Sequence, residues 1–181
     1  MNTDTSFQPI QVTGTSDLEN LLQRLVGPHV ANTRGVLFED LILCRGLPGS
    51  GKSAVARALA MVGYVHFEAD MFFYVDGIYR YDRRWIQDAH EWCKRKTREA
   101  LRRGERVVVS NTFTRLSEMA PYCVMGANAV RVLEATGHWE TRNGVPEEQV
   151  QRMAARWEPL PAAMRASQAS ASLTHSAMEV Q

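Results

Sequence analysis

Short apolar runs and segments with helical character follow one another along the central part of the chain. The apolar or alternating segments predict strands, at residues 41–44, 64–70, 106–111 and 129–135. The segments between and after them predict helices, at residues 52–61, 82–103, 115–125 and 147–157. Strands that alternate with helices build a parallel sheet covered by helices. The pattern therefore predicts an α/β fold with a mainly parallel sheet.

The two ends of the chain lack this alternation. Residues 1–16 are polar and turn-rich, and four leucines at helical spacing predict a helix over residues 18–26. The last twenty residues are rich in Ala and Ser without helical periodicity. We therefore expect an N-terminal arm and covering helix at residues 1–35, one domain at residues 36–160, and a disordered tail at residues 161–181.

Composition limits the class of protein. The chain has 181 residues, of which 45% are hydrophobic and 23% charged, as is ordinary for a soluble globular protein. No apolar run is long enough to span a membrane and the polar N-terminus lacks the order of a signal peptide, so we expect a cytoplasmic protein without membrane association. Cys44, Cys93 and Cys123 are too widely spaced to indicate a disulfide framework or a zinc site. A net charge of +1 means that any basic surface must be local.

A phosphate-binding motif follows the strand at residues 41–44. The segment Gly46-Leu47-Pro48-Gly49-Ser50-Gly51-Lys52-Ser53 has Gly, four free positions, then Gly-Lys-Ser, and Ala54 continues into the helix. The glycines let the chain fold around an anion with its amide N–H groups inward, and the helix N-terminus adds partial positive charge. We expect residues 46–54 to bind ATP, with Lys52 at the β and γ phosphates and Ser53 as a ligand of Mg²⁺. The motif and its setting predict a three-layer P-loop NTPase fold of the kinase-like type.

Further segments accompany this loop in a fixed order. They are Glu68–Phe73, Asp76–Tyr79, Ala89–Cys93, Ser110–Thr114, Glu118–Tyr122, Asn143–Pro146 and Arg152–Glu158. With the loop, the set covers residues 41–158 and resembles the small P-loop kinases related to the kinase half of bacteriophage polynucleotide kinase. The loop alone is shared by many unrelated NTPases, whereas the ordered set is far more selective.

The resemblance implies roles for particular side chains. Asp70, after the second strand, is similar to the aspartate that orients and deprotonates the acceptor hydroxyl in that family, and phosphoryl transfer needs such a base. The resemblance also implies a lid whose arginines cover the ATP phosphates, for which Arg142 and Arg152 are the catalytic candidates together with Arg156. The alternatives are a carboxylate that caps the next turn and arginines that are plain surface charges.

One position departs from the usual pattern of P-loop enzymes. The third strand usually ends in an aspartate that supports Mg²⁺, but here it runs into Ser110-Asn111. Neutral groups there would hold the metal only through water, so a slow enzyme and a protein that binds ATP without turnover both stay open as alternatives. Glu68 shares a strand face with Asp70, so it either assists through Mg²⁺-bound water or is a solvated strand end.

Basic and aromatic residues are concentrated after the second strand. Residues 80–106 contain ten Lys or Arg against five Asp or Glu, and residues 72–85 contain six aromatic side chains. Such a mixture is typical of a groove that stacks bases and follows a phosphate backbone. The alternative is a solvated helix face beside aromatic residues of the core.

The leading hypothesis from the sequence is an ATP- and Mg²⁺-dependent kinase that phosphorylates a hydroxyl of DNA or another nucleic acid. The acceptor is either a 5′-hydroxyl end or a hydroxymethylated base, as in phage DNA that contains 5-hydroxymethyluracil. Two alternatives stay open: a nucleoside or small-metabolite kinase, and a non-catalytic ATP-binding regulator.

Overall fold

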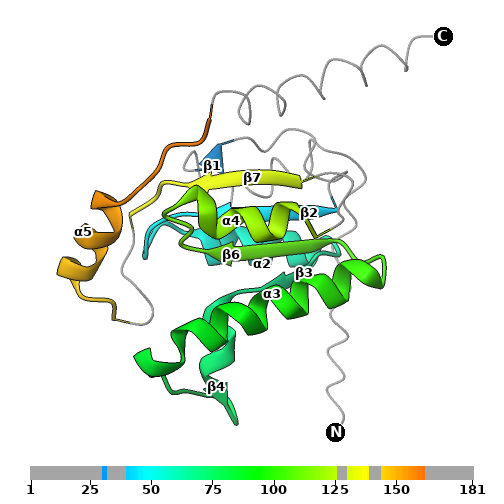
Figure 1. Ribbon diagram of the computed structural model, residues 1–181, viewed down its shortest axis with the longest axis horizontal. Coiled ribbons are helices and arrows are strands. Elements are labelled where there is room, and N and C mark those ends of the chain that lie inside the picture. The colour runs from blue at the N-terminus through cyan, green and yellow to red at the C-terminus, as the bar shows by residue number, and fades with distance from the viewer. Residues whose placement is uncertain (1–29, 32–39, 126–129, 139–143, 162–181) are drawn as a thin grey trace, which may run out of the picture.

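The computed structural model describes residues 30–31, 40–125, 130–138 and 144–161 (Figure 1). The predicted N-terminal helix and tail, together with Arg142, lie outside the described residues. The division of the chain into arm, domain and tail therefore stays a prediction.

Within the described residues, the main sheet is built from five strands. They are β1 (Val30–Ala31), β2 (Leu41–Arg45), β3 (Val65–Phe67), β6 (Val107–Asn111) and β7 (Val130–Ala135). Their order is β1-β7-β2-β6-β3, in which β1 pairs antiparallel with β7 and all other pairs are parallel. The predicted α/β architecture with a mainly parallel sheet is thus confirmed.

Helices cover both faces of this sheet, which gives three layers (Figure 1). The α-helices are α2 (Lys52–Met61), α3 (Ile86–Arg102), α4 (Leu116–Cys123) and α5 (Glu147–Ala155). Alternate residues of each strand point to opposite faces. Ile42 and Val108 therefore pack with Leu59 of α2, whereas Leu41 and Val109 pack on the other face with residues of α3 and α4, such as Ala89 and Met119.

The segment after β3 departs from the predicted strand at residues 64–70. The strand ends at Phe67, and the chain continues as a short 3-10 helix, η3 (Ala69–Phe73). A two-stranded hairpin follows, β4 (Tyr74–Val75) and β5 (Ile78–Tyr79), joined by Asp76 and Gly77 with φ angles of 52° and 77°. Asp-Gly with two positive φ angles is the preferred two-residue hairpin turn. Asp70 thus lies on a helical turn beyond the strand.

The long helix predicted at residues 82–103 begins later than expected. Its first turn is a separate 3-10 helix, η4 (Arg83–Trp85). The Asp82 carboxylate caps this turn by accepting a hydrogen bond from the backbone N–H of Arg84 at 2.9 Å. In the part of the chain that the structure describes, no helix has the length and apolar character needed to cross a membrane.

Candidate active site

The glycine-rich loop joins the end of β2 to the start of α2. Gly49 and Gly51 have φ angles of 79° and 89°, which favour glycine, and the N–H of Ser50 donates to the carbonyl of Leu47 at 3.0 Å. Gly51 is the N-cap of α2, so the first N–H groups of that helix face the loop. The loop therefore has the backbone form of an anion cradle.

Neighbouring strands hold this loop from both sides. The N–H of Gly46 donates to the carbonyl of Thr112 at 3.2 Å, after β6, and the N–H of Gly137, after β7, donates to the carbonyl of Ser50 at 3.2 Å. A Cβ on Gly46 would lie 2.2 Å from Ser50 Oγ and 2.7 Å from the carbonyl oxygen of Ala135. Because that space is filled, only glycine fits at residue 46.

Lys52 lies at the start of α2 with its ammonium turned toward the loop. Its Nζ donates to the carbonyl of Leu47 at 3.3 Å. Burial lowers the pKa of Lys52, while the negative charges of Glu68 and Asp70 act in the opposite direction. A cation that is partly desolvated beside carboxylates has strong interactions with a phosphate that enters the loop.

A network of four polar side chains connects the loop to the ends of β3 and β6. Ser53 Oγ and Ser110 Oγ both donate to Glu68 Oε2, at 2.8 and 2.9 Å. Since the Ser110 proton is used there, its oxygen accepts the 2.7 Å bond from Nε2 of His66, which is consequently the protonated ring nitrogen. Burial lowers the pKa of His66 and favours its neutral form. The sequence indicated Glu68 as a candidate near the metal, but it gave no sign of the contacts that Glu68 makes with Ser53 and Ser110.

Asp70 is half-buried in the first turn of η3, and a neighbouring strand fixes that turn. Asn111 Oδ1, at the end of β6, accepts a hydrogen bond from the N–H of Ala69 at 2.9 Å. Asp70 is close enough to Lys52 to oppose the lowering of its pKa. Burial, followed by the charge of Asp70, raises the pKa of Tyr79 to about 12. Asn111 thus has a positioning role that its neutral side chain did not suggest in the sequence.

Two of the arginines predicted for a lid, Arg152 and Arg156, lie within the described residues and contact partners outside the glycine-rich loop. Arg152 pairs with Glu148 one turn earlier on α5, and their side chains are 73% and 76% exposed. Arg156 Nε donates to Thr114 Oγ1 at 3.1 Å, in the segment between β6 and α4. The residues in the lid position therefore reach other partners in this conformation, and their contact with phosphates stays a prediction.

A buried arginine anchors the segment after α5, which the sequence did not suggest. Arg45, fully buried at the end of β2, lies 3.2 Å from Glu134 and donates to the carbonyl of Glu158 at 2.9 Å. Its guanidinium stacks 3.8 Å from the ring centroid of Trp157. The one feature of the sequence that could have indicated this role is that Arg45 is a charged residue at the end of an apolar run, directly before the loop. Arg45 thus ties the base of α5 to the strand that carries the loop.

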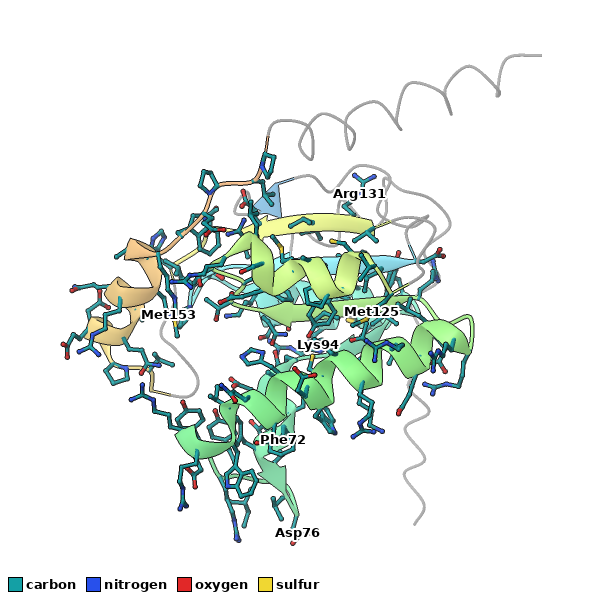
Figure 2. The ribbon with its side chains drawn as sticks, in the orientation of Figure 1. Phe72, Asp76, Lys94, Met125, Arg131 and Met153 are labelled. Atoms are coloured by element: carbon teal, nitrogen blue, oxygen red, sulfur yellow. The ribbon has the colours of Figure 1, made fainter. Side chains whose placement is uncertain are left out.

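The basic and aromatic stretch divides into two parts. Along α3 and just beyond it, four of its cations pair with nearby carboxylates, in Lys94–Glu91, Arg95–Glu99, Lys96–Glu99 and Arg103–Glu105. These exposed pairs are typical of a solvated helix face. The aromatic side chains of residues 72–85 instead gather around η3 and the hairpin, where Phe72 and Asp76 are labelled in Figure 2.

The chain is similar in sequence to known proteins. A family model described as AAA domain, AAA_33, matches residues 41–134. Human NEDD4-binding protein 2 is 33% identical over 128 residues, which are 62% of this chain and 7% of that protein, so the chain spans a small part of this relative.

Solved structures with a similar backbone include two kinds of protein. A gluconokinase from Sinorhizobium meliloti 1021 has 21% identity and a TM-score of 0.46, over 77% of this chain and 94% of that chain. A chain of the Pnkp1/Rnl/Hen1 RNA repair complex has 14% identity and a TM-score of 0.43, over 78% of this chain and 46% of that chain.

Proposed function

The chain belongs to the AAA_33 family of AAA domains, and on that premise we propose that it is an ATP-dependent kinase that phosphorylates a hydroxyl of a nucleic acid. The observation that carries the proposal is the set of contacts at the carboxyl edge of the sheet. The glycine-rich loop, the Ser53–Glu68 pair and the turn that bears Asp70 all meet there. Ligands of open α/β sheets bind at that edge.

The phosphate side of the proposed reaction uses the loop and Lys52. Backbone N–H groups of the loop and of the first turn of α2 would bind the β and γ phosphates of ATP. The ammonium of Lys52 would leave the carbonyl of Leu47, 3.3 Å away, for the phosphate oxygens. Fixed donors of this kind stabilise the charge that spreads over the γ-phosphoryl group as it transfers.

Mg²⁺ fits the Ser53–Glu68 pair. A hydroxyl and a carboxylate are hard oxygen donors, and Mg²⁺ commonly binds one or two such protein groups while it keeps several waters. Bound Mg²⁺ would neutralise charge on the β and γ phosphates. Ser53 would be its ligand, and Glu68 would supply the carboxylate that Ser110-Asn111 lacks.

The acceptor side of the proposed reaction uses Asp70. A carboxylate that accepts the hydroxyl proton makes the acceptor oxygen a better nucleophile for in-line attack. Its turn is held by the Asn111 bond to Ala69, so the carboxylate has a defined position. The O–P bond to the acceptor forms as the bond from the γ-phosphorus to the β–γ bridging oxygen breaks, and the proton passes to Asp70. Arg142 and Arg152 are proposed to join the phosphates when the lid closes.

A panel of acceptors with γ-labelled ATP tests this function. The acceptors are circular single-stranded DNA with and without 5-hydroxymethyluracil, linear DNA and RNA with 5′-hydroxyl ends, and free nucleosides. We expect label on a nucleic acid, with a Lys52→Ala variant as the control for contaminating kinases. Label on circular DNA only when hydroxymethyl bases are present identifies the base as acceptor, and label on linear ends alone identifies the 5′-hydroxyl. Label on nucleosides alone, or none despite ATP binding, contradicts the proposal.

A further inference from the structure

Exposed large hydrophobic side chains are concentrated on one short stretch. Among the described residues six such side chains are exposed, and five of them lie between residues 74 and 85. These five are Tyr74, Val75, Ile78, Tyr81 and Trp85. The sixth, Val124, lies at the end of α4. We call residues 72–85 the aromatic hairpin; it projects from the body of the molecule below α3 (Figures 1 and 2).

The aromatic hairpin has a fixed internal structure. Tyr74 pairs with Tyr79 across β4 and β5, and the N–H of Arg80 donates to the carbonyl of Phe73 at 2.8 Å. The buried ring of Phe73 contacts Tyr81 edge-on at 5.1 Å between ring centroids and Tyr79 at 6.2 Å. Edge-to-face contacts at these distances are favourable. Phe73 therefore holds the rings of Tyr79 and Tyr81 in place before any ligand binds.

Rings of the aromatic hairpin line an open hollow of about 570 Å³. Phe72, Phe73, Tyr81 and Trp85 supply its aromatic walls, and Arg80 and Asp82 line it with one cation and one carboxylate. The volume is within the range of small-ligand sites, about 300–1,000 Å³. A planar ring such as a nucleobase can enter a hollow of this size and stack on an aromatic wall.

The hollow adjoins the proposed base. Asp70 and Phe73 both belong to η3, and side chains three residues apart in a 3-10 helix lie on the same side, with a rise of about 2 Å per residue. Tyr79, which packs on Phe73, has its pKa raised partly by the charge of Asp70. Phe73, which lines the hollow, is therefore one helical turn from the carboxylate.

The charges around the hollow favour a polyanion. Arg80, Arg83 and Arg84 lie within five residues of one another, and Arg84 is paired with Asp82. Within the described part of the chain, no ion pair involves Arg80 or Arg83. On α3, Lys94, Arg95 and Lys96 pair with acids of the same helix, whereas no ion pair within the described residues involves Arg98 or Arg102. Arginines available beside exposed rings suit a phosphate backbone whose bases stack.

We propose that the aromatic hairpin binds the acceptor strand as single-stranded nucleic acid, with an unpaired base stacked on Tyr81 and Trp85 and a neighbouring hydroxyl at Asp70. The inference rests on the proposed function, because it names the surface that presents the acceptor. Arg80 and Arg83 contact the phosphates that flank the stacked base. An unpaired base is required, since a base inside a duplex has no free face.

Binding of labelled oligonucleotides to the full-length protein tests this surface. Fluorescence anisotropy is measured with a fluorescein-labelled 12-nucleotide single strand, its duplex, and an abasic strand of equal length. We expect the single strand to bind more tightly than the other two. Tyr81→Ala and Trp85→Ala should each raise Kd by about 5- to 150-fold, the range for loss of one stacked base. Trp85→Phe, which keeps a ring, should retain most of the affinity.

Controls separate stacking from folding and charge. Tyr81 and Trp85 are about half exposed, so their variants should keep ATP affinity and melting temperature. Val124→Ala removes an 82% exposed apolar side chain outside the hairpin and should bind the strand like the native protein. Arg80→Gln should reduce the slope of log K against log salt by about 0.7, as for loss of one phosphate contact on a single strand.

Several results would overturn the proposal. Equal affinity for the abasic strand excludes stacking, and unchanged affinity in both ring variants excludes this surface. If Trp85→Ala only converts a dimer to a monomer, as sedimentation would show, the surface joins two copies of the chain. If the ring variants bind the strand with native affinity and still transfer label to nucleic acid, the proposed function stands and only the aromatic hairpin is rejected as the binding surface. Label transfer to nucleosides alone rejects the proposed function. The anisotropy measurements then still show whether the aromatic hairpin binds single-stranded nucleic acid.

Discussion

The proposed phosphate side of the site and its proposed acceptor side are built in opposite ways. Strands β2 and β6, which carry the glycine-rich loop and Asn111, are buried along their whole length, and backbone hydrogen bonds hold the loop on both sides. The aromatic hairpin has exposed strands, and its rings are held mainly by one another. Phosphates are the same in every nucleotide, so backbone groups in a rigid frame suffice for them. An acceptor needs recognition by side chains, which exposed elements can supply.

The largest effect is expected from removal of the cation on the phosphate side. Lys52→Ala should lower turnover by about 100- to 1,000-fold and weaken ATP binding, because no other side chain of the loop carries positive charge. Steady-state rates and ATP titrations check both quantities. Native ATP affinity in this variant would contradict the role of Lys52. Val124→Ala, remote from the loop, is the control and should behave like the native protein.

Rigidity of the phosphate side is tested at Gly46. Gly46→Ala should destabilise the protein by about 1–3 kcal/mol and reduce ATP affinity, because the new Cβ would meet Ser50 Oγ at 2.2 Å and the Ala135 carbonyl at 2.7 Å. Denaturant unfolding measures the loss. Adding Ser50→Gly removes the contacts with the serine side chain and should restore part of the stability. No loss in the single variant would show that the loop is not rigid, whereas a loss without rescue would assign it to the contact with the Ala135 carbonyl.

The link between the two sides is tested at Asn111. Asn111→Ala removes the acceptor of the buried Ala69 N–H, which should cost about 1–3 kcal/mol of stability. The turn that carries Asp70 would then lose its fixed position, so turnover should fall while ATP affinity stays near native. Paired measurements of kcat and ATP Kd check this. A fall in ATP affinity with native turnover would assign Asn111 to the phosphate side instead.

The smallest effect concerns acid. The pKa of buried His66 lies below its ordinary value, so the unfolded chain takes up the proton first as the pH falls. Stability is therefore full above about pH 6.5 and declines as the pH falls through the folded pKa. His66→Gln should reduce the difference in melting temperature between pH 7.5 and pH 5.5. An unchanged or larger difference would show that His66 does not contribute to acid sensitivity.

The phosphate side was the more predictable from sequence, for a physical reason. Its form depends on contiguous residues, so strand, loop and helix follow from local pattern and from the glycines at residues 49 and 51. The pairing of Ser53 with Glu68 depends on where β3 lies beside β6, and the contact of Asn111 with Ala69 depends on the same alignment. Register between distant strands is a tertiary property that no single segment encodes.

The acceptor side and the α5 region were less predictable. Composition predicted aromatic and basic residues in one stretch, but it could not separate the paired cations of α3 from the exposed rings of the hairpin. The strand expected to reach Asp70 ends at Phe67, since the next residues form a 3-10 turn. The bonds of Arg45 to the segment after α5 join residues more than one hundred positions apart. Spacing patterns carry no information about such contacts.

The central claim is that an alcohol meets the γ-phosphoryl group beside Asp70, and one comparison tests it directly. Phosphoryl transfer and ATP affinity are measured side by side for the native protein and for Asp70→Asn, which keeps the size of the side chain and removes its basicity. Because the base is lost, we expect transfer to fall by about 100- to 10,000-fold while ATP Kd is unchanged. Native turnover in Asp70→Asn would contradict it.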